Sequence, residues 1–249
     1  MNGDALIEAL DLPASSRVDQ RVPKKLLLEN GAPTASDKRL INDGIEELLW
    51  LAALKPTTIG VPEYRDDVRE YLEIAVLRLT LRAAAKASRV TELIHRAIPY
   101  PVFLIRSQPD GLALSLAHLR WSQGQSEQTV LDGPLITATL GAETPATDAF
   151  LASLNVTSQP RQHLHALYQG WIERFEAHAA ARLTGSFTPA MDAAAERRRT
   201  ALAEHEQLTR EMTSLRARAD RETQLNRRVE LNLQLKQLES RLAEAATHL

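Results

Sequence analysis

The stretch VFLIRSQPDGLALSLAHL, residues 102–119, decides the fold class. Two aliphatic runs, Val102–Arg106 and Leu112–Leu119, flank the turn sequence Gln108-Pro109-Asp110-Gly111. Proline presets the backbone angle of the first inner turn position, and glycine tolerates the conformation that follows. We therefore predict a β-hairpin, so that at least part of the sheet is antiparallel.

The segments on either side of this hairpin predict helices as well as strands. Tyr71–Arg82 is the longest strand candidate, and Glu73 shares one of its faces with Ala75 and Leu77. A helix is expected to begin at Ser88 and to end before Pro99. The remaining expectations are a short edge element at Lys24–Leu28, a helix from Thr34 to Ala52, a strand at Thr57–Val61 and a last strand at Leu135–Leu140. The fold class expected is α+β, with a mixed, partly antiparallel sheet and flanking helices.

Three parts are expected along the chain: an α/β domain at residues 12–140, a linker with a packing helix at 141–189, and a long helical segment at 190–249. The packing helix is predicted to start near Ser158 and to place its apolar face on the sheet. That face comprises Leu164, Leu167, Tyr168, Trp171 and Phe175.

The last part predicts a long helix with the repeat of a coiled coil. Residues 190–249 hold no glycine or proline and are rich in Ala, Leu, Glu, Arg and Gln. Two apolar seams follow 4,3,4 spacing, namely Leu208, Met212, Leu215 and Ala219, then Leu231, Leu235, Leu238, Leu242, Ala245 and Leu249. They are out of phase and separated by the polar stretch Asp220–Arg228. At this polar stretch we expect either that the seam shifts to another face of the helix, or that the helix bends or folds back.

Composition excludes several classes of protein. The chain has no cysteine, so disulfides and thiolate sites are absent, and a net charge of −2 gives no global attraction to nucleic acid. No signal-peptide pattern opens the sequence, and no apolar run approaches the roughly 20 residues that a membrane span needs. We expect a cytoplasmic protein.

Glu73 is the most prominent catalytic candidate. With Asp66 and Asp67 it would supply carboxylates for a divergent metal-dependent nuclease. Such sites usually carry a lysine two residues beyond the second acid, where this chain has Ala75. We therefore favour the alternative that Glu73 is an ion-paired carboxylate at the start of its strand.

Histidine, serine and glycine patterns add no further site. His163 and His165 are two apart on a predicted helix and would face different ways, while His95 and His118 are isolated in sequence. No nucleophile elbow and no glycine-rich phosphate loop is present. The expectation is that the chain needs no metal and no cofactor.

Basic residues cluster in two places that would suit phosphate contacts. Lys24 and Lys25 lie in the N-terminal region, and Arg227 and Arg228 lie on the long helix. Acidic residues stand among both pairs, so a solvated face is favoured. Non-specific nucleic-acid binding remains an alternative.

Several stretches together resemble a bacterial family of uncharacterised proteins, domain of unknown function 4391. They are Leu12-Pro13, Val22-Pro23-Lys24-Lys25, the segment from Ile45 through Trp50 to Pro56-Thr57-Thr58-Ile59, Glu73-Ile74, Ile98-Pro99-Tyr100-Pro101, and Gln224–Asn232. The resemblance implies a genetic setting beside helicases and DNA methyltransferases in restriction- or phage-defence-type loci. It carries no catalytic residues.

These observations favour a non-catalytic assembly subunit that acts through protein–protein contacts. The partner expected is a helicase or a DNA methyltransferase, or a second copy joined through the C-terminal helix. The segment Asn226–Asn232, which overlaps the polar stretch between the two seams and which we call the polar break together with it, is expected to mark where this helix meets its own α/β domain or a partner.

Overall fold

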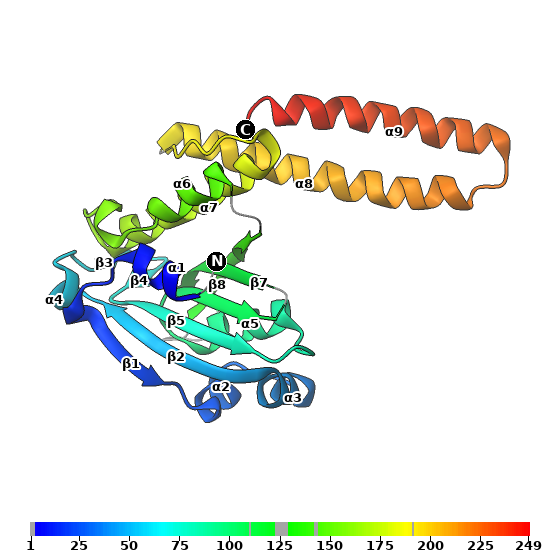
Figure 1. Ribbon diagram of the computed structural model, residues 1–249. Helices are drawn as coiled ribbons and strands as arrows, with labels where there is room; N and C mark the ends of the chain where they lie inside the picture. The colour runs from blue at the N-terminus through cyan, green and yellow to red at the C-terminus, as the bar shows by residue number, and fades with distance from the viewer. Residues whose placement is uncertain (1–2, 110, 123–128, 142–143, 191) are drawn as a thin grey trace. The chain divides into compact units, whose positions relative to one another are not determined.

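The computed structural model describes residues 3–109, 111–122, 129–141, 144–190 and 192–249 (Figure 1). The chain forms two compact units, Met1–Phe175 and Glu176–Leu249. The first is built around a sheet, and the second consists of helices. None of the described helices is both long and apolar enough to cross a bilayer.

The first unit is organised by a six-stranded sheet with the order β1-β2-β5-β6-β7-β8. Its strands are β1 (Arg17–Arg21), β2 (Ile45–Leu54), β5 (Ile74–Leu81), β6 (Val102–Gln108), β7 (Gly111–Trp121) and β8 (Thr129–Leu140). Every neighbouring pair is antiparallel except β5 and β6, which run parallel. The predicted mixed sheet is thus confirmed. A separate two-stranded hairpin pairs β3 (Tyr64–Arg65) with β4 (Glu70–Tyr71).

Helix α5 (Ala87–Ala97) makes the crossover that joins the two parallel strands. With α2 (Lys24–Asn30) and α3 (Ala35–Gly44) it encloses the main core on one face of the sheet. Alternate residues of β5 enter this core, as the period of a strand requires: Ala75, Leu77, Leu79 and Leu81.

The opposite face carries α1 (Gly3–Leu10), α6 (Pro145–Ala152) and α7 (Leu164–Thr184), of which residues up to Phe175 belong to this unit. Phe103 of β6 packs against Trp171 at a ring-centroid distance of 4.8 Å. The Tyr168 hydroxyl accepts from the Ala117 amide at 2.9 Å and donates to the Val102 carbonyl at 2.8 Å. The predicted apolar stripe of α7 therefore packs on the sheet as expected.

Three predicted elements are wrong in type. Lys24–Asn30 is helix α2 rather than the short edge element expected, and only Leu27 of its leucine run is fully buried. The predicted helix from Thr34 ends at Gly44, and β2 follows at once. Spacings of three and four residues among apolar side chains fit a helix, but pairing with β1 and β5 overrides that pattern here.

The third corrected element is α4 (Pro56–Ile59), predicted as a strand. Pro56 stands in the first helical turn, where its missing N–H costs nothing. Gly60 closes the helix with a φ of +64°, which glycine adopts without strain. These two signals outweigh the β-branched residues between them.

The central hairpin is confirmed, since β6 and β7 pair from Gln108↔Gly111 to Leu104↔Ser115. The turn residue Asp110 lies outside the described residues. Thr34 caps α3 as predicted, because its side chain accepts from the Asp37 amide at 3.1 Å. The short elements left are α6 and the 3₁₀ turns η1 (Ala14–Ser16) and η2 (Val156–Ser158). Residues 144–147 were expected to form a linker or a cap, and Thr144 caps α6, because its side chain accepts from the Thr147 amide at 3.2 Å.

The second unit contains two long helices, α8 (Asp192–Arg221) and α9 (Leu225–Ala246). The polar break contains the reversal between them at residues 222–224, so the chain folds back into an antiparallel hairpin (Figure 1). A continuous helix through this stretch is therefore excluded, and of the alternatives left open by the sequence the fold-back holds.

Candidate functional site: the outward face of the C-terminal hairpin

The two predicted seams pack against each other across the hairpin. Leu208, Met212, Leu215 and Ala219 of α8 are all buried. Their counterparts on α9, Leu231, Leu235, Leu238 and Leu242, are half-buried, and Ala245 is buried. The reversal explains why the seams are out of phase along the sequence, because each belongs to a separate helix.

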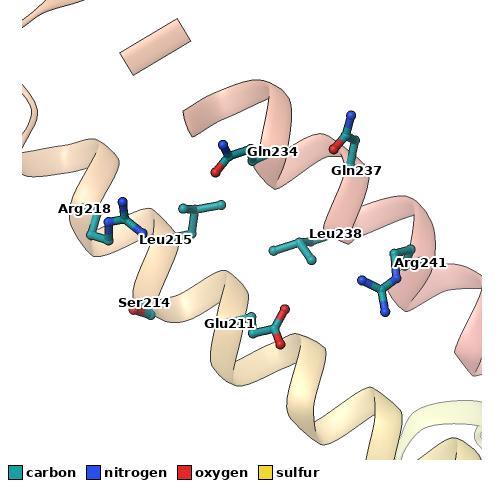
Figure 2. Close-up of a pocket in the computed structure, with 8 residues that line it drawn as sticks. All are labelled: Glu211, Ser214, Leu215, Arg218, Gln234, Gln237, Leu238 and Arg241. Carbon is teal, nitrogen blue, oxygen red and sulfur yellow. The ribbon is translucent and has the colours of Figure 1, made fainter. Parts of the chain in front are cut away.

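A shallow groove of about 430 Å³ lies between the two helices. Figure 2 shows Leu215 of α8 and Leu238 of α9 pointing toward one another across it. Polar and charged side chains line its rims: Glu211, Ser214, Arg218, Gln234, Gln237 and Arg241. The apolar contact is therefore narrow, and two helices alone leave the α9 leucines partly exposed to water.

Helix α9 carries a second apolar surface, which we call the outer row: Leu225, Val229 and Leu233. These side chains are 65%, 50% and 58% exposed. Spacing by four residues places them on one face. Val229 and Leu238 are nine residues apart, about two and a half turns, so the outer row lies on the side of α9 opposite the seam. An amphipathic helix of a hairpin needs one apolar face, and α9 has two.

The residues singled out in the polar break flank the outer row. Asn226 and Asn232 are exposed, so neither is part of the α8–α9 seam. Arg227 and Arg228 are exposed as well. Asn226 and Asn232 thus give the apolar row a polar border on its two sides.

The basic pair near the N-terminus is not a free cationic patch. Lys24 Nζ donates to the backbone carbonyls of Asn42 at 2.9 Å and Ile45 at 2.6 Å. Burial, followed by the charge of Arg82, lowers the pKa of Lys24 below its usual value. Lys25 is exposed and lies 3.8 Å from Glu29 on the next turn. Lys24 therefore joins α2 to the segment that runs from α3 into β2.

Glu73 is the residue just before β5, and it is buried and ion-paired there. Its Oε2 lies 2.9 Å from Lys55 Nζ, and its side chain is 8% exposed. The hydrogen bond and charge of Glu73 raise the pKa of Lys55 above its usual value. The lysine partner, Lys55, directly follows the end of β2. It does not stand at position 75, two residues beyond Glu73, where a nuclease site usually carries its lysine.

Asp66 and Asp67 lie in the turn between β3 and β4, directly after Arg65 ends β3. Asp66 Oδ2 accepts from the Tyr64 hydroxyl at 2.8 Å, and its Oδ1 accepts from the amides of Val68 and Arg69. These hydrogen bonds, the tyrosine's first, lower the pKa of Asp66. Among the described residues no group of three metal-ligating side chains gathers around these acids or elsewhere.

Sequence reasoning missed a cluster of histidine and tyrosine rings in the first unit. His163 precedes α7, which begins at Leu164, so the expectation that His163 and His165 diverge on one helix is wrong. Their ring centroids are 5.9 Å apart, and those of His118 and His165 are 5.3 Å apart. The Tyr64 and Tyr71 rings complete the cluster. The helix was predicted to start near Ser158, but α7 begins at Leu164, and this later start is the signal that was missed.

Oriented hydrogen bonds run through this cluster. The Gln169 amide donates to Glu173 Oε1 at 3.3 Å, so its carbonyl faces His118 Nε2 at 3.0 Å. His118 Nε2 must then carry the proton, and His118 Nδ1 accepts from the buried Tyr71 hydroxyl. The chain of bonds orders the sheet against α7 and leaves Tyr71 without solvent access.

Comparison with known proteins identifies one family. The model of Domain of unknown function (DUF4391) matches residues 10–242. The chain belongs to this family. Neither a curated protein nor a solved structure shows significant similarity to the chain. The DUF4391 match runs from the last residue of α1 through most of α9, so most of the C-terminal hairpin is part of the family's own sequence pattern.

Proposed function

We propose that this DUF4391 protein is a non-catalytic assembly subunit that docks a partner protein on the outer row of α9. The observation that carries the proposal is the second apolar face of α9. Each of its three side chains would contribute roughly 1.5–3 kcal/mol on full burial, and less from its present half-exposed state. The folded hairpin leaves these three side chains exposed to water, and association with a partner would bury them.

A helix of the partner is the occupant that fits best. Two-helix hairpins bury only one side of each helix, and a third helix packed on α9 would bury the outer row and shield the half-exposed leucines beside it. Asn226 and Asn232 at the border would fix register, as polar residues do beside helical seams. A second copy of this chain can supply the same surface, which makes a homodimer the second form of the proposal.

The setting we propose is a cytoplasmic bacterial complex that acts on DNA, with a helicase or methyltransferase as partner. It rests on the resemblance of the sequence to a defence-associated family. The site itself supports contact with protein more than chemistry, because Glu73 and Asp66 are engaged in the ion pair and turn described above.

Co-expression with the products of adjacent genes tests the proposal. The wild-type chain should co-purify with one of them or elute as a defined oligomer by light scattering. Leu225→Gln combined with Leu233→Gln should abolish that association and leave the thermal unfolding of the chain unchanged. The matched control is Val68→Gln, an exposed apolar residue of the first unit at 47%. Association that survives the double substitution would refute the proposal.

A further inference from the structure

Helix α5 covers a largely apolar cavity with a few polar groups, on the main-core face of the sheet at β7 and β8. The cavity has a volume of about 310 Å³ and is lined from α5, β6, β7 and β8. A second cavity of about 480 Å³ shares Ser88 and Leu135 with it and extends along α5 as far as Arg96. The pair forms a recess in the first unit that is independent of the C-terminal hairpin.

Thr91 is the most informative residue of this recess. Its side chain is 5% exposed and lines the cavity, and within the described part of the chain its Oγ1 has no hydrogen-bond partner. A buried hydroxyl without a partner costs about 1–3 kcal/mol. Such a group in the wall of a cavity is available to hydrogen-bond a ligand that enters it.

A buried polar pair, Ser115 and His95, lies at the cavity, which Ser115 lines. Ser115 Oγ lies 2.9 Å from His95 Nε2, and both residues are 2% exposed. Burial lowers the pKa of His95 to about 3, so the imidazole is neutral at pH 7 and adds no charge to the cavity. Ser88 and Thr137 bring two more hydroxyls to its edge.

Arg106 is the one charged residue among those that line the 310 Å³ cavity. Arg106 Nη1 donates to Gln108 Oε1 at 3.3 Å. A guanidinium has five N–H donors, so this contact is compatible with further acceptors. Apolar atoms of Leu114 and Leu135 form the remaining wall.

We propose that this cavity binds a small molecule that joins an apolar body to a carboxylate or phosphate group. Arg106 supplies the cation, the hydroxyls of Thr91 and Thr137 donate to the anionic oxygens, and the aliphatic wall holds the apolar body. Pockets of this composition, apolar with a few convergent polar groups, are typical of ligand sites.

The test uses hexanoate and hexyl phosphate as probes, with 1-hexanol as the neutral control, in NMR titrations of the ¹⁵N-labelled full chain. At least one anion should shift amide signals of α5 and β8, and 1-hexanol should bind at least tenfold more weakly. Which anion binds identifies the headgroup. No shift with either anion, or equal binding of 1-hexanol, would overturn the proposal.

Variants separate a ligand role from a structural one. Thr91→Val should weaken binding of the anion about tenfold. It should also raise the melting temperature of the free protein, because an unsatisfied hydroxyl is removed. A purely structural threonine would show a lowered melting temperature and unchanged binding. Thr213→Val, on the exposed face of α8, is the matched control.

Two further substitutions keep the test decisive if Thr91→Val does not fold. Thr137→Val, at an exposed strand position, should weaken the anion and leave 1-hexanol unaffected. Arg106→Gln should remove the preference for anions, and Arg106→Lys should retain part of it. Unchanged anion binding in both Thr137→Val and Arg106→Gln would exclude the site.

Discussion

Arg216 on α8 lies 3.0 Å from Glu239 on α9, which ties the two helices of the C-terminal hairpin together. Both side chains are more than half exposed, at 57% and 54%. Exposed ion pairs contribute at most about 1 kcal/mol, so this contact sets register more than it stabilises. The hairpin must therefore be held by its apolar seam, and the outer row must be available for another purpose.

Truncation of a seam leucine should lower the stability of the hairpin, whereas truncation of an outer-row leucine should leave it almost unchanged. Leu208→Ala, at a 1% exposed position, should lower the free energy of unfolding of the hairpin by about 2–4 kcal/mol. Leu233→Ala should change it by no more than about 0.5 kcal/mol, because the side chain already faces water. Urea denaturation followed by circular dichroism measures both. Equal losses would mean that the outer row packs within the chain.

The border asparagines should control assembly. Replacing Asn226 and Asn232 with Leu widens the apolar surface of α9, and removes the polar groups that restrict register. We expect a change in the oligomer by light scattering, or in the complex recovered by co-purification. Thr213→Leu on the polar face of α8 is the control. Assembly unchanged by the double substitution would count against a docking role for this part of α9.

The histidine cluster should make stability fall in acid. Burial, then the charges of His118 and Arg69, lower the pKa of His165 from its usual 6.5 to about 4. The unfolded chain therefore binds a proton between these values that the folded chain does not. Stability should decline as pH falls from about 6.5 toward about 4, and His165→Gln should reduce that decline.

Imidazole NMR signals measure the titration directly. His205, on α8 and outside the cluster, serves as the reference histidine. Because buried His95 also contributes to acid sensitivity, the comparison must be made between wild type and His165→Gln, not from the wild-type curve alone. A titration of His165 near 6.5 would show that the cluster is open to water.

The ion pair of Glu73 should be structural. Glu73→Gln leaves Lys55 without its carboxylate and should cost about 1 kcal/mol, since the lysine is part exposed. Because the folded pKa of Lys55 is raised, the contribution should be complete below the usual lysine pKa and lost as pH rises past the raised value. The exposed Glu63→Gln is the control. Magnesium-dependent cleavage of DNA lost in a folded Glu73→Gln variant would instead identify a nuclease.

Elements with two agreeing signals were predictable from sequence. The β6–β7 hairpin has aliphatic runs around a proline–glycine turn, and Thr34 begins α3 with a capping side chain. Elements with one signal were not. The apolar residues of β2 have helical spacing, and only pairing with distant strands makes them a strand. In α4 the first residue, Pro56, and the following Gly60 decide the structure, not the residues between them.

The candidate site was predictable in part. Both leucine seams were visible, because burial on one side of a helix imposes a fixed spacing. The outer row was not, since Leu225, Val229 and Leu233 stand out only once the reversal at residues 222–224 assigns the other leucines to the α8–α9 contact. The histidine cluster and the cavity under α5 join residues far apart in sequence, which no local pattern reveals.

The most direct measurement of the central claim uses the absence of cysteine from the chain. Val229→Cys and Val68→Cys place single thiols at positions of similar exposure, 50% and 47%. In the dilute purified protein both should react with a maleimide at similar rates. In cells that express the chain at its native level, the thiol at position 229 should be protected at least tenfold relative to that at position 68. Equal labelling of the two positions in cells would show that the outward face of α9 is uncovered there, and would contradict the account.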